Sequence, residues 1–192
     1  MVLDDGEFPG EAGRIGIPAF EDLYQTYRTA VFSFAVYLTH NPGEAEDLFQ
    51  ETWLRVVKNR DKIDTRQNMK AWIFTITANL HRDMLRKKRL RRLFRSQKSS
   101  ASITKSEIFR FPEGRENSDP AGDLEHKDMA KALAGAITGL PDRQRSVFVL
   151  REIEGFQYSE ISAIMRLPPG TLKSLMHRAV KRLQKELSVF RP

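Results

Sequence analysis

Residues 158–187 contain two consecutive apolar patterns with helical spacing, and a pair of prolines separates them. Pro168 and Pro169 stop one helix and begin the next, because proline breaks a helix interior but fits its first turn. The apolar positions expected to face the core are Ile161, Ile164 and Met165 in the first helix and Leu172, Met176, Ala179 and Leu183 in the second. The sequence therefore predicts two short helices joined by a tight turn, as in a helix-turn-helix.

The second of these helices has a polar and basic free face. Its residues are Thr171, Lys173, Ser174, His177, Arg178 and Lys181. A basic helix that follows a tight turn fits the major groove of DNA. The alternative is an ordinary helical hairpin whose charges contact only solvent, and the local sequence leaves this alternative open.

Charge and the lack of cysteine narrow the possible classes of protein. The 192 residues include 32 Lys and Arg against 25 Asp and Glu, a net charge of +7 that favours a polyanionic partner. Without cysteine there is no disulfide, thiolate zinc site or cysteine nucleophile. The acidic N-terminal residues do not resemble a secretory signal, and no apolar run reaches the roughly 18–20 residues of a membrane span. We expect a soluble, cytoplasmic protein without membrane insertion.

Apolar periodicity divides the chain into two helical halves and shows no strand-like alternation. Residues 1–19 are expected to be a flexible arm, since they offer little to bury. Residues 20–95 and 124–192 are expected to form two domains, and the polar residues 96–123 a linker between them. The expected fold class is all-α, with two small helical domains joined by a flexible linker.

The turn between the first two helical patterns carries a helix-start signal. Asn41 can cap the helix, Pro42 fits its first position, and Glu44 can reach back to the cap. The residues of this helix expected to be buried are Ala45, Leu48, Phe49, Thr52 and Val56. Its exposed face then consists of Asp47, Gln50, Glu51 and Leu54. Such an acidic face repels DNA and suits the docking of another protein. Taken alone, it is explained more simply as a solvated helix face.

A third helical pattern, residues 70–93, ends in dense positive charge. The basic residues are Arg82, Arg86, Lys87, Lys88, Arg89, Arg91, Arg92 and Arg95, opposed only by Asp83. Like charges this dense repel one another unless an anion is near. Trp72, Phe74 and Asn79 precede them, a pattern typical of a surface that stacks unpaired bases and holds a nucleic-acid backbone. We interpret Phe74 as a core residue, whereas Trp72 fits the core and the surface equally.

Patterns for catalysis are not found. The four histidines, His40, His81, His126 and His177, lie in no H-x-x-x-H arrangement, and there is no glycine-rich phosphate-binding motif. We expect no enzyme, no metal and no cofactor.

Three groups of residues, in order along the chain, carry a resemblance to a known family. They are residues 47–53 (DLFQETW), 71–80 (AWIFTITANL), and 140–143 (LPDR) followed by 170–174 (GTLKS) and 177–179 (HRA). With them the chain resembles an extracytoplasmic-function (group 4) sigma factor of the sigma-70 family. The resemblance implies a protein that binds core RNA polymerase, recognises the −10 and −35 promoter elements and initiates transcription of a regulon. It also implies control by an anti-sigma factor.

The resemblance assigns roles to residues of this chain. Region 2, residues 20–95, would dock on the β′ clamp helices through Asp47, Gln50, Glu51 and Leu54. Contacts with the −10 element would come from Arg60, Asn68, Trp72, Asn79, Arg82, Arg86 and Lys87. Region 4, residues 124–192, would contact the β flap and read the −35 element through Gly170, Thr171, Lys173, Ser174, Leu175, His177, Arg178 and Lys181.

The chain departs from the family pattern at four positions: Thr75, Gln157, Arg166 and Leu175. Thr75 stands for an arginine and removes a phosphate contact, and Gln157 weakens the cap of the first helix of the helix-turn-helix. Arg166 stands where glycine commonly makes the turn, so a positive φ there costs about 1 kcal/mol or more. Leu175 stands for an arginine and is expected to face outward, toward a thymine methyl group.

Two other functions remain open. A sigma mimic that only titrates an anti-sigma factor would need neither the basic end of the third helix nor the basic recognition face, and this chain has both. A helix-turn-helix repressor with an effector-binding first half is disfavoured by the acidic face, and binding to core polymerase would distinguish it.

Overall fold

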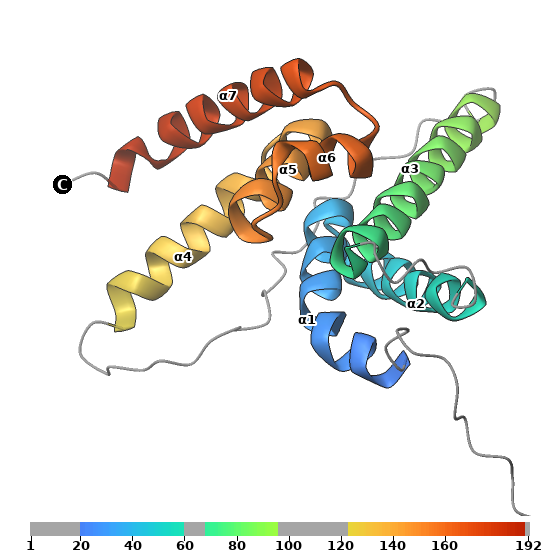
Figure 1. Cartoon of the computed structure of the whole chain (residues 1–192). Helices are drawn as coiled ribbons and strands as arrows, with labels where there is room; N and C mark the ends of the chain where they lie inside the picture. The colour runs from blue at the N-terminus through green and yellow to red at the C-terminus, as the bar shows by residue number, and fades with distance from the viewer. Residues whose placement is uncertain (1–19, 60–67, 96–122, 191–192) are drawn as a thin grey trace, which may run out of the picture.

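The computed structural model describes residues 20–59, 68–95 and 123–190, and every regular element in this part of the chain is a helix (Figure 1). The N-terminal unit consists of α1 (Phe20–Thr39), α2 (Pro42–Lys58) and α3 (Met69–Arg95). The C-terminal unit consists of α4 (Asp123–Thr138), α5 (Asp142–Phe148), the π-helix η2 (Val149–Ile153), α6 (Tyr158–Met165), α7 (Pro169–Glu186) and the 3-10 helix η3 (Leu187–Phe190). The expected all-α class is confirmed. The expected arm and nearly all of the expected linker lie outside the described residues.

Aromatic rings hold the three helices of the N-terminal unit together. The rings of Tyr24 on α1 and Trp53 on α2 meet edge to face with centroids 4.9 Å apart. Phe34 on α1 stacks on Phe74 on α3 at 5.1 Å, and both are completely buried. Burial of each such ring contributes on the order of 1.5–3 kcal/mol to folding. The prediction that Phe74 is a core residue is confirmed.

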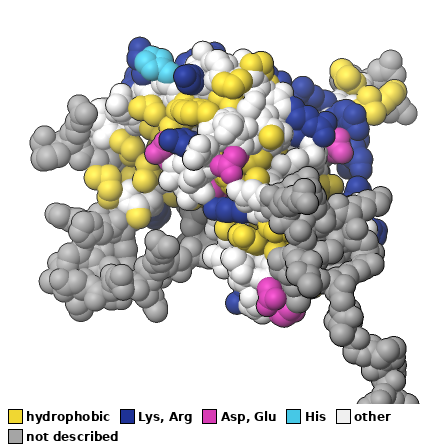
Figure 2. Space-filling model, in the orientation of Figure 1, with side chains coloured by type: hydrophobic (Ala, Val, Ile, Leu, Met, Phe, Trp, Pro, Cys, Tyr) yellow, Lys and Arg dark blue, Asp and Glu magenta, His cyan; other side chains and the backbone are white. Residues whose placement is uncertain are grey.

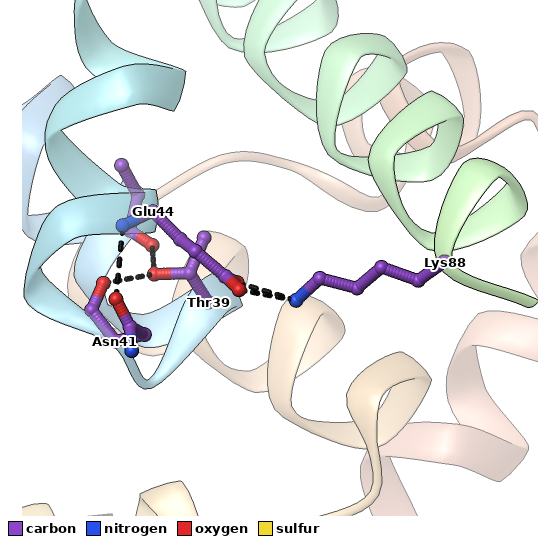
Figure 3. Close-up of polar contacts among 5 residues, drawn as sticks. Thr39, Asn41, Glu44 and Lys88 are labelled. Carbon is purple, nitrogen blue, oxygen red and sulfur yellow. Dashed lines mark hydrogen bonds and ion pairs between the residues drawn. The ribbon is translucent and has the colours of Figure 1, made fainter. Parts of the chain in front are cut away.

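At the start of α2 the predicted Asn41 cap forms, but the predicted return contact of Glu44 does not (Figure 3). The side-chain oxygen of Asn41 accepts a hydrogen bond of 3.0 Å from the Glu44 amide, and Pro42 occupies the first turn. The Glu44 carboxylate does not complete a capping box. It binds the Lys88 ammonium of α3 at 2.6 Å, so it ties α2 to α3. The Glu44 carboxylate binds the Lys88 ammonium in preference to the backbone amide of the cap, because a hydrogen bond between two ionised groups is the stronger one.

The helix-turn-helix of α6 and α7 has the strained turn that the sequence predicts. Arg166 adopts the left-handed conformation with φ 55° and ψ 46°. The Ser162 hydroxyl stabilises this turn by donating a hydrogen bond of 2.6 Å to the carbonyl of Leu167. At the start of α6 the carboxylate of Glu160 accepts a hydrogen bond of 2.8 Å from the backbone amide of Gln157. The replacement at Gln157 therefore leaves a helix start that is still capped.

Leu175 on α7 is oriented differently from the prediction. Its side chain is buried, with 7% exposed, whereas Met176 is only half-buried. Leu175 and Met176 flank the line through Leu172 and Ala179, so helical spacing alone does not decide which of them faces the core. Helix α7 packs on α5 and α6, and the burial of the two side chains shows that Leu175 faces the interior more fully than Met176 does.

The degree of burial was also mispredicted at other apolar positions. Phe49 and Met165, expected to be buried, are half-buried. In the C-terminal unit the structure also leaves the apolar side chains of Met129, Leu133 and Ile153 exposed. Met129 and Leu133 lie on α4, which contacts α7 and η3. Helical periodicity marks the apolar face of α4 without showing how much of it a neighbour covers.

The two units pack directly on each other. Phe156, which precedes α6, meets Phe74 of α3 edge to face at 5.1 Å. Lys70 of α3 pairs with the carboxylate of Glu154 at 3.1 Å and donates a hydrogen bond of 2.7 Å to its backbone carbonyl. A single continuous apolar core therefore runs through both units. No helix in the described part of the chain is long and apolar enough to span a bilayer.

Candidate nucleic-acid and polymerase-binding surfaces

The free face of α7 carries the residues expected to read DNA. All of them except Leu175 are exposed: Gly170, Thr171, Lys173, Ser174, His177, Arg178 and Lys181. The helix starts with Pro169 and Gly170, so no bulky side chain covers its first turn. The face combines hydroxyl groups near its N-terminus with cations further along, as major-groove binding requires. Leu175 has to be removed from this set, because its side chain is buried and cannot reach a base.

A second basic surface covers the free end of α3, where Lys and Arg side chains gather (Figure 2). Arg86 and Lys87 are exposed there, as expected. Leu90, Leu93 and Phe94 are also exposed, at 54%, 71% and 78%. The end of α3 therefore reaches beyond the helical bundle, and its charges have room for a polyanion. Arg60 lies outside the described residues.

The residues expected to hold the −10 strand lie along the first half of α3. Trp72, Asn79 and Arg82 are half-buried, and Asn68 is exposed at the helix start. Asn68 caps α3 by accepting a hydrogen bond of 3.2 Å from the Ala71 amide. Arg82 donates hydrogen bonds to the side-chain oxygen of Asn79 and, at 3.2 Å, to the Ala78 carbonyl. The structure thus brings Asn79 and Arg82 together.

Helix α6 lies against this part of α3 (Figure 1). The side-chain amide of Asn68 donates a hydrogen bond of 2.6 Å to the Glu160 carboxylate. The Arg82 side chain donates one of 3.2 Å to the backbone carbonyl of Ile164. Burial and the nearby Arg166 charge both lower the pKa of Arg82. We call this arrangement of the two units the closed arrangement. In it, protein groups occupy hydrogen-bonding positions of two residues expected to contact DNA.

The acidic face of α2 is exposed, as the sequence predicts. Asp47 and Gln50 are exposed, and Leu54 has 52% of its surface exposed. Glu51 is less accessible because it forms an ion pair of 2.8 Å with Arg55 one turn later. An exposed ion pair of this kind contributes little to stability, so the face keeps its charges available for a partner.

A cluster of titratable groups around the buried Arg145, between the two units, was missed by the sequence analysis. Arg145 of α5 is only 2% exposed, donates to the Thr138 carbonyl at 3.0 Å, and lies 3.4 Å from the His40 ring. It also pairs with Asp142 at 2.6 Å. Burial raises the pKa of Asp142, but the hydrogen bond and charge of Arg145 more than offset it and leave the pKa lowered.

The two histidines of this cluster are neutral at physiological pH. Burial and the Arg145 charge together lower the pKa of His40 to about 4. Burial likewise lowers the pKa of His81 to about 4, helped by Arg145 and Lys88 and opposed by Asp142 and Glu44. Neither histidine stands in a recognisable motif. Only the tertiary contact of α1, α3 and α5 reveals this cluster.

Taken together, the helix-turn-helix and its exposed basic face are typical of a DNA-binding protein. Among the described residues no group of three His, Cys, Asp or Glu side chains could hold a metal ion.

Comparisons with known families give a finer assignment. Residues 23–91 match the model of sigma-70 region 2, and residues 123–183 match a model of sigma-70 region 4. The chain belongs to the extracytoplasmic-function (ECF) sigma factors of the sigma-70 family. Proteins of this family are non-enzymatic factors of transcription initiation, so the expectation of no enzyme is confirmed.

Similarity to individual proteins extends over most of the chain. It is 34% identical over 157 residues to the ECF RNA polymerase sigma factor EcfG of Rhodopseudomonas palustris, covering 82% of this chain and 78% of that one. Identity to the ECF sigma factor SigW of Bacillus subtilis is 28% over 169 residues, covering 88% and 89% of the two chains. The solved structure of the sigma factor RpoE of Bartonella quintana with the anti-sigma factor NepR matches with a TM-score of 0.68 and 27% identity, covering 90% of this chain and 98% of that one.

Proposed function

We propose that this sigma factor acts in the cytoplasm, docks on core RNA polymerase through the acidic face of α2, and reads the −35 element with α7. The exposed basic face of α7 carries this proposal. It faces solvent even in the closed arrangement, so no rearrangement has to precede its first contact with duplex DNA. Its cations would bind phosphates, and Thr171 and Ser174 lie near the helix N-terminus, where base edges are read.

Recognition of the −10 element requires a different state of the chain. Asn68 and Arg82 bind α6 in the closed arrangement, and Trp72 is half-buried beside them. We infer that α6 moves away from α3 before these residues take up a melted strand. Residues 96–123, between the units, would permit this movement.

Control by an anti-sigma factor is the second part of the proposal. The RpoE structure of Bartonella quintana is a complex with an anti-sigma factor. An anti-sigma factor acting on this chain would hold the two units in a relative placement that keeps α3 from the promoter. The exposed faces of α2 and of the end of α3 offer surfaces on which such a partner can bind.

The proposal is tested by transcription with reconstituted holoenzyme on promoters selected by the chain itself. Arg178→Gln combined with Lys181→Gln should reduce promoter binding and transcription and should lower the dependence of binding on salt concentration, because phosphate contacts are lost. Arg28→Gln, an exposed cation on α1, is the matched control. If the double variant transcribes at the wild-type level, α7 does not take part in promoter recognition.

The same assay separates a sigma factor from a sigma mimic. A mimic would bind an anti-sigma factor yet support no transcription with core polymerase on any selected promoter.

A further inference from the structure

A cavity of about 470 Å³ lies between the two units. Its walls come from α1, α3, α5, η2 and the turn after α6, so it exists only while the units are in the closed arrangement. A volume of this size falls in the range of small-molecule sites, about 300–1,000 Å³. Two of its lining residues on α3, Arg82 and Arg86, are expected to bind DNA, yet most of the lining has no role in the proposed function.

The inner wall of the cavity is aliphatic. Leu38, Leu85, Leu150, Met165 and Leu167 contribute to it. Such a wall binds a hydrocarbon by burial of apolar surface, about 0.8 kcal/mol for each CH₂ group. It offers few hydrogen-bonding groups that could fix a nucleobase or a sugar, so an alkyl chain fits it better than a nucleoside does.

The lining is also rich in arginine: Arg82, Arg86, Arg89, Arg143 and Arg166. Among the lining residues that the structure describes, Asp142 is the only carboxylate, and Arg145 already binds it at 2.6 Å. Within the described part of the chain, Arg89, Arg143 and Arg166 have no ion-pair partner. Within residues 20–59, 68–95 and 123–190, no carboxylate balances the charge of these three arginines at the cavity.

The uncompensated charges come from both units. Arg89 lies on α3, whereas Arg143 lies on α5 and Arg166 in the turn after α6. Closing the units places these like charges around one cavity. The pKa of Arg82, which also lines the cavity, is lowered first by burial and then by the Arg166 charge. An anion bound between them would replace repulsion by attraction. Arginine suits a phosphate group because its planar fork donates two parallel hydrogen bonds.

We propose that this cavity binds a small amphiphile with a phosphate head group and an aliphatic chain, and that the ligand holds the two units together. The phosphate contacts the arginines of both units, and the chain lies along the aliphatic wall. Bound ligand then favours the closed arrangement and competes with binding of the −10 strand to α3.

Calorimetric titration of the full chain with octyl phosphate, below its micelle concentration, tests the site. We expect one saturable site per chain, with inorganic phosphate and octanol each binding at least tenfold more weakly because each lacks half of the recognised chemistry. Arg143→Gln and Arg166→Gln should each weaken octyl phosphate binding at least fivefold. Both side chains are exposed, so the substitutions leave the core unchanged. Arg28→Gln is the matched control and should bind as the wild type does.

The outcomes separate this proposal from its alternatives. Equal binding by the wild type and both variants would overturn it, as would inorganic phosphate binding as tightly as octyl phosphate. Tighter binding of ATP than of octyl phosphate would contradict the aliphatic assignment. Binding of only an acidic helical peptide would show that the cavity belongs to a protein partner. All of these measurements use the isolated chain, so they stand apart from the transcription assay for the proposed function.

Discussion

The side-chain amide of Asn68 at the start of α3 donates a hydrogen bond of 2.6 Å to the carboxylate of Glu160 on α6. The two residues are far apart in sequence and belong to different units. Glu160 uses its other carboxylate oxygen to accept a hydrogen bond of 2.8 Å from the Gln157 amide. A residue expected to contact the −10 element is thus bound to the helix-turn-helix that is expected to read the −35 element. If Asn68 contacts the −10 strand as proposed, this bond has to break first.

Loss of the Lys70 charge should open the units. Glu154 has only 5% of its side chain exposed, and burial raises the pKa of this carboxyl although Lys70 opposes the shift. Lys70→Met leaves a buried carboxylate without its partner, which costs roughly 3–5 kcal/mol. Because the chain lacks cysteine, thiols introduced at the exposed Gln25 and Gln184 can carry a pair of distance probes. We expect a longer and broader distance distribution in Lys70→Met.

The control for this experiment is Arg55→Met, which breaks the exposed pair with Glu51 and should change stability by at most about 1 kcal/mol. An unchanged distance in Lys70→Met would show that this pair does not hold the closed arrangement.

Acidification should destabilise the buried histidine cluster. His40 and His81 have pKa values lowered to about 4. In the unfolded chain each histidine takes up a proton as the pH falls below about 6.5, whereas the folded chain resists protonation until about pH 4. The unfolded state binds more protons in this window, so the free energy of unfolding should fall as the pH is lowered from 6.5 to 4.

Urea unfolding at a series of pH values measures this slope. His40→Asn, which tolerates the positive φ of 56° at this position, combined with His81→Gln should flatten it. His177→Gln on the exposed face of α7 is the control. A slope as steep in the double variant as in the wild type would assign the pH dependence to other groups.

Charge reversal on α2 should weaken binding to core polymerase. Asp47 lies on the acidic face and is exposed. If this face meets a basic surface of the clamp, Asp47→Lys places like charges together and weakens binding by several kcal/mol. Glu46→Lys is a matched control, since Glu46 is also exposed but points about 100° away around the helix. Equal affinities of the two variants for core polymerase, measured by fluorescence anisotropy, would move the docking site elsewhere.

Substitutions on α3 should separate promoter melting from binding of the polymerase. Trp72→Ala and Asn79→Ala should reduce open-complex formation detected by permanganate reactivity, by about 1–3 kcal/mol for a lost stacking contact. Binding to core polymerase should stay at the wild-type level. Trp72 is half-buried, so Trp72→Phe, which keeps an aromatic ring in the packing, serves as the control. Wild-type melting by both alanine variants would contradict the assignment of this face.

Leu175 should behave as a core residue and not as a specificity residue. Leu175→Ala is expected to lower the free energy of unfolding by about 2–5 kcal/mol, and Leu175→Arg by at least as much, since it places a charge in an apolar environment. Ser174→Arg, one position earlier and exposed, should leave stability nearly unchanged. Urea unfolding measures all three. A stable Leu175→Arg protein with altered base preference would mean that this side chain turns outward.

The sequence alone determined the helices and the family. Asn41 and Pro42 mark the start of α2, Pro168 and Pro169 separate the two helices of the helix-turn-helix, and Arg166 shows the positive φ expected from its position. These features depend on a few neighbouring residues, because capping, proline geometry and turn conformation are local effects. Periodicity likewise gave the approximate apolar side of α2 and α7, without deciding the residues at its edges.

Only the tertiary structure decided which helix faces which. The choice between Leu175 and Met176, the exposure of Met129 and the partner of Glu44 all depend on the helix that packs alongside. Burial is a property of a pair of surfaces, so one helix cannot determine it. The cluster around Arg145 and the cavity between the units join residues from α1, α3 and α5. Their positions depend on how the two units, which are far apart in sequence, pack on each other. Small differences in packing energy select one arrangement of the units among several.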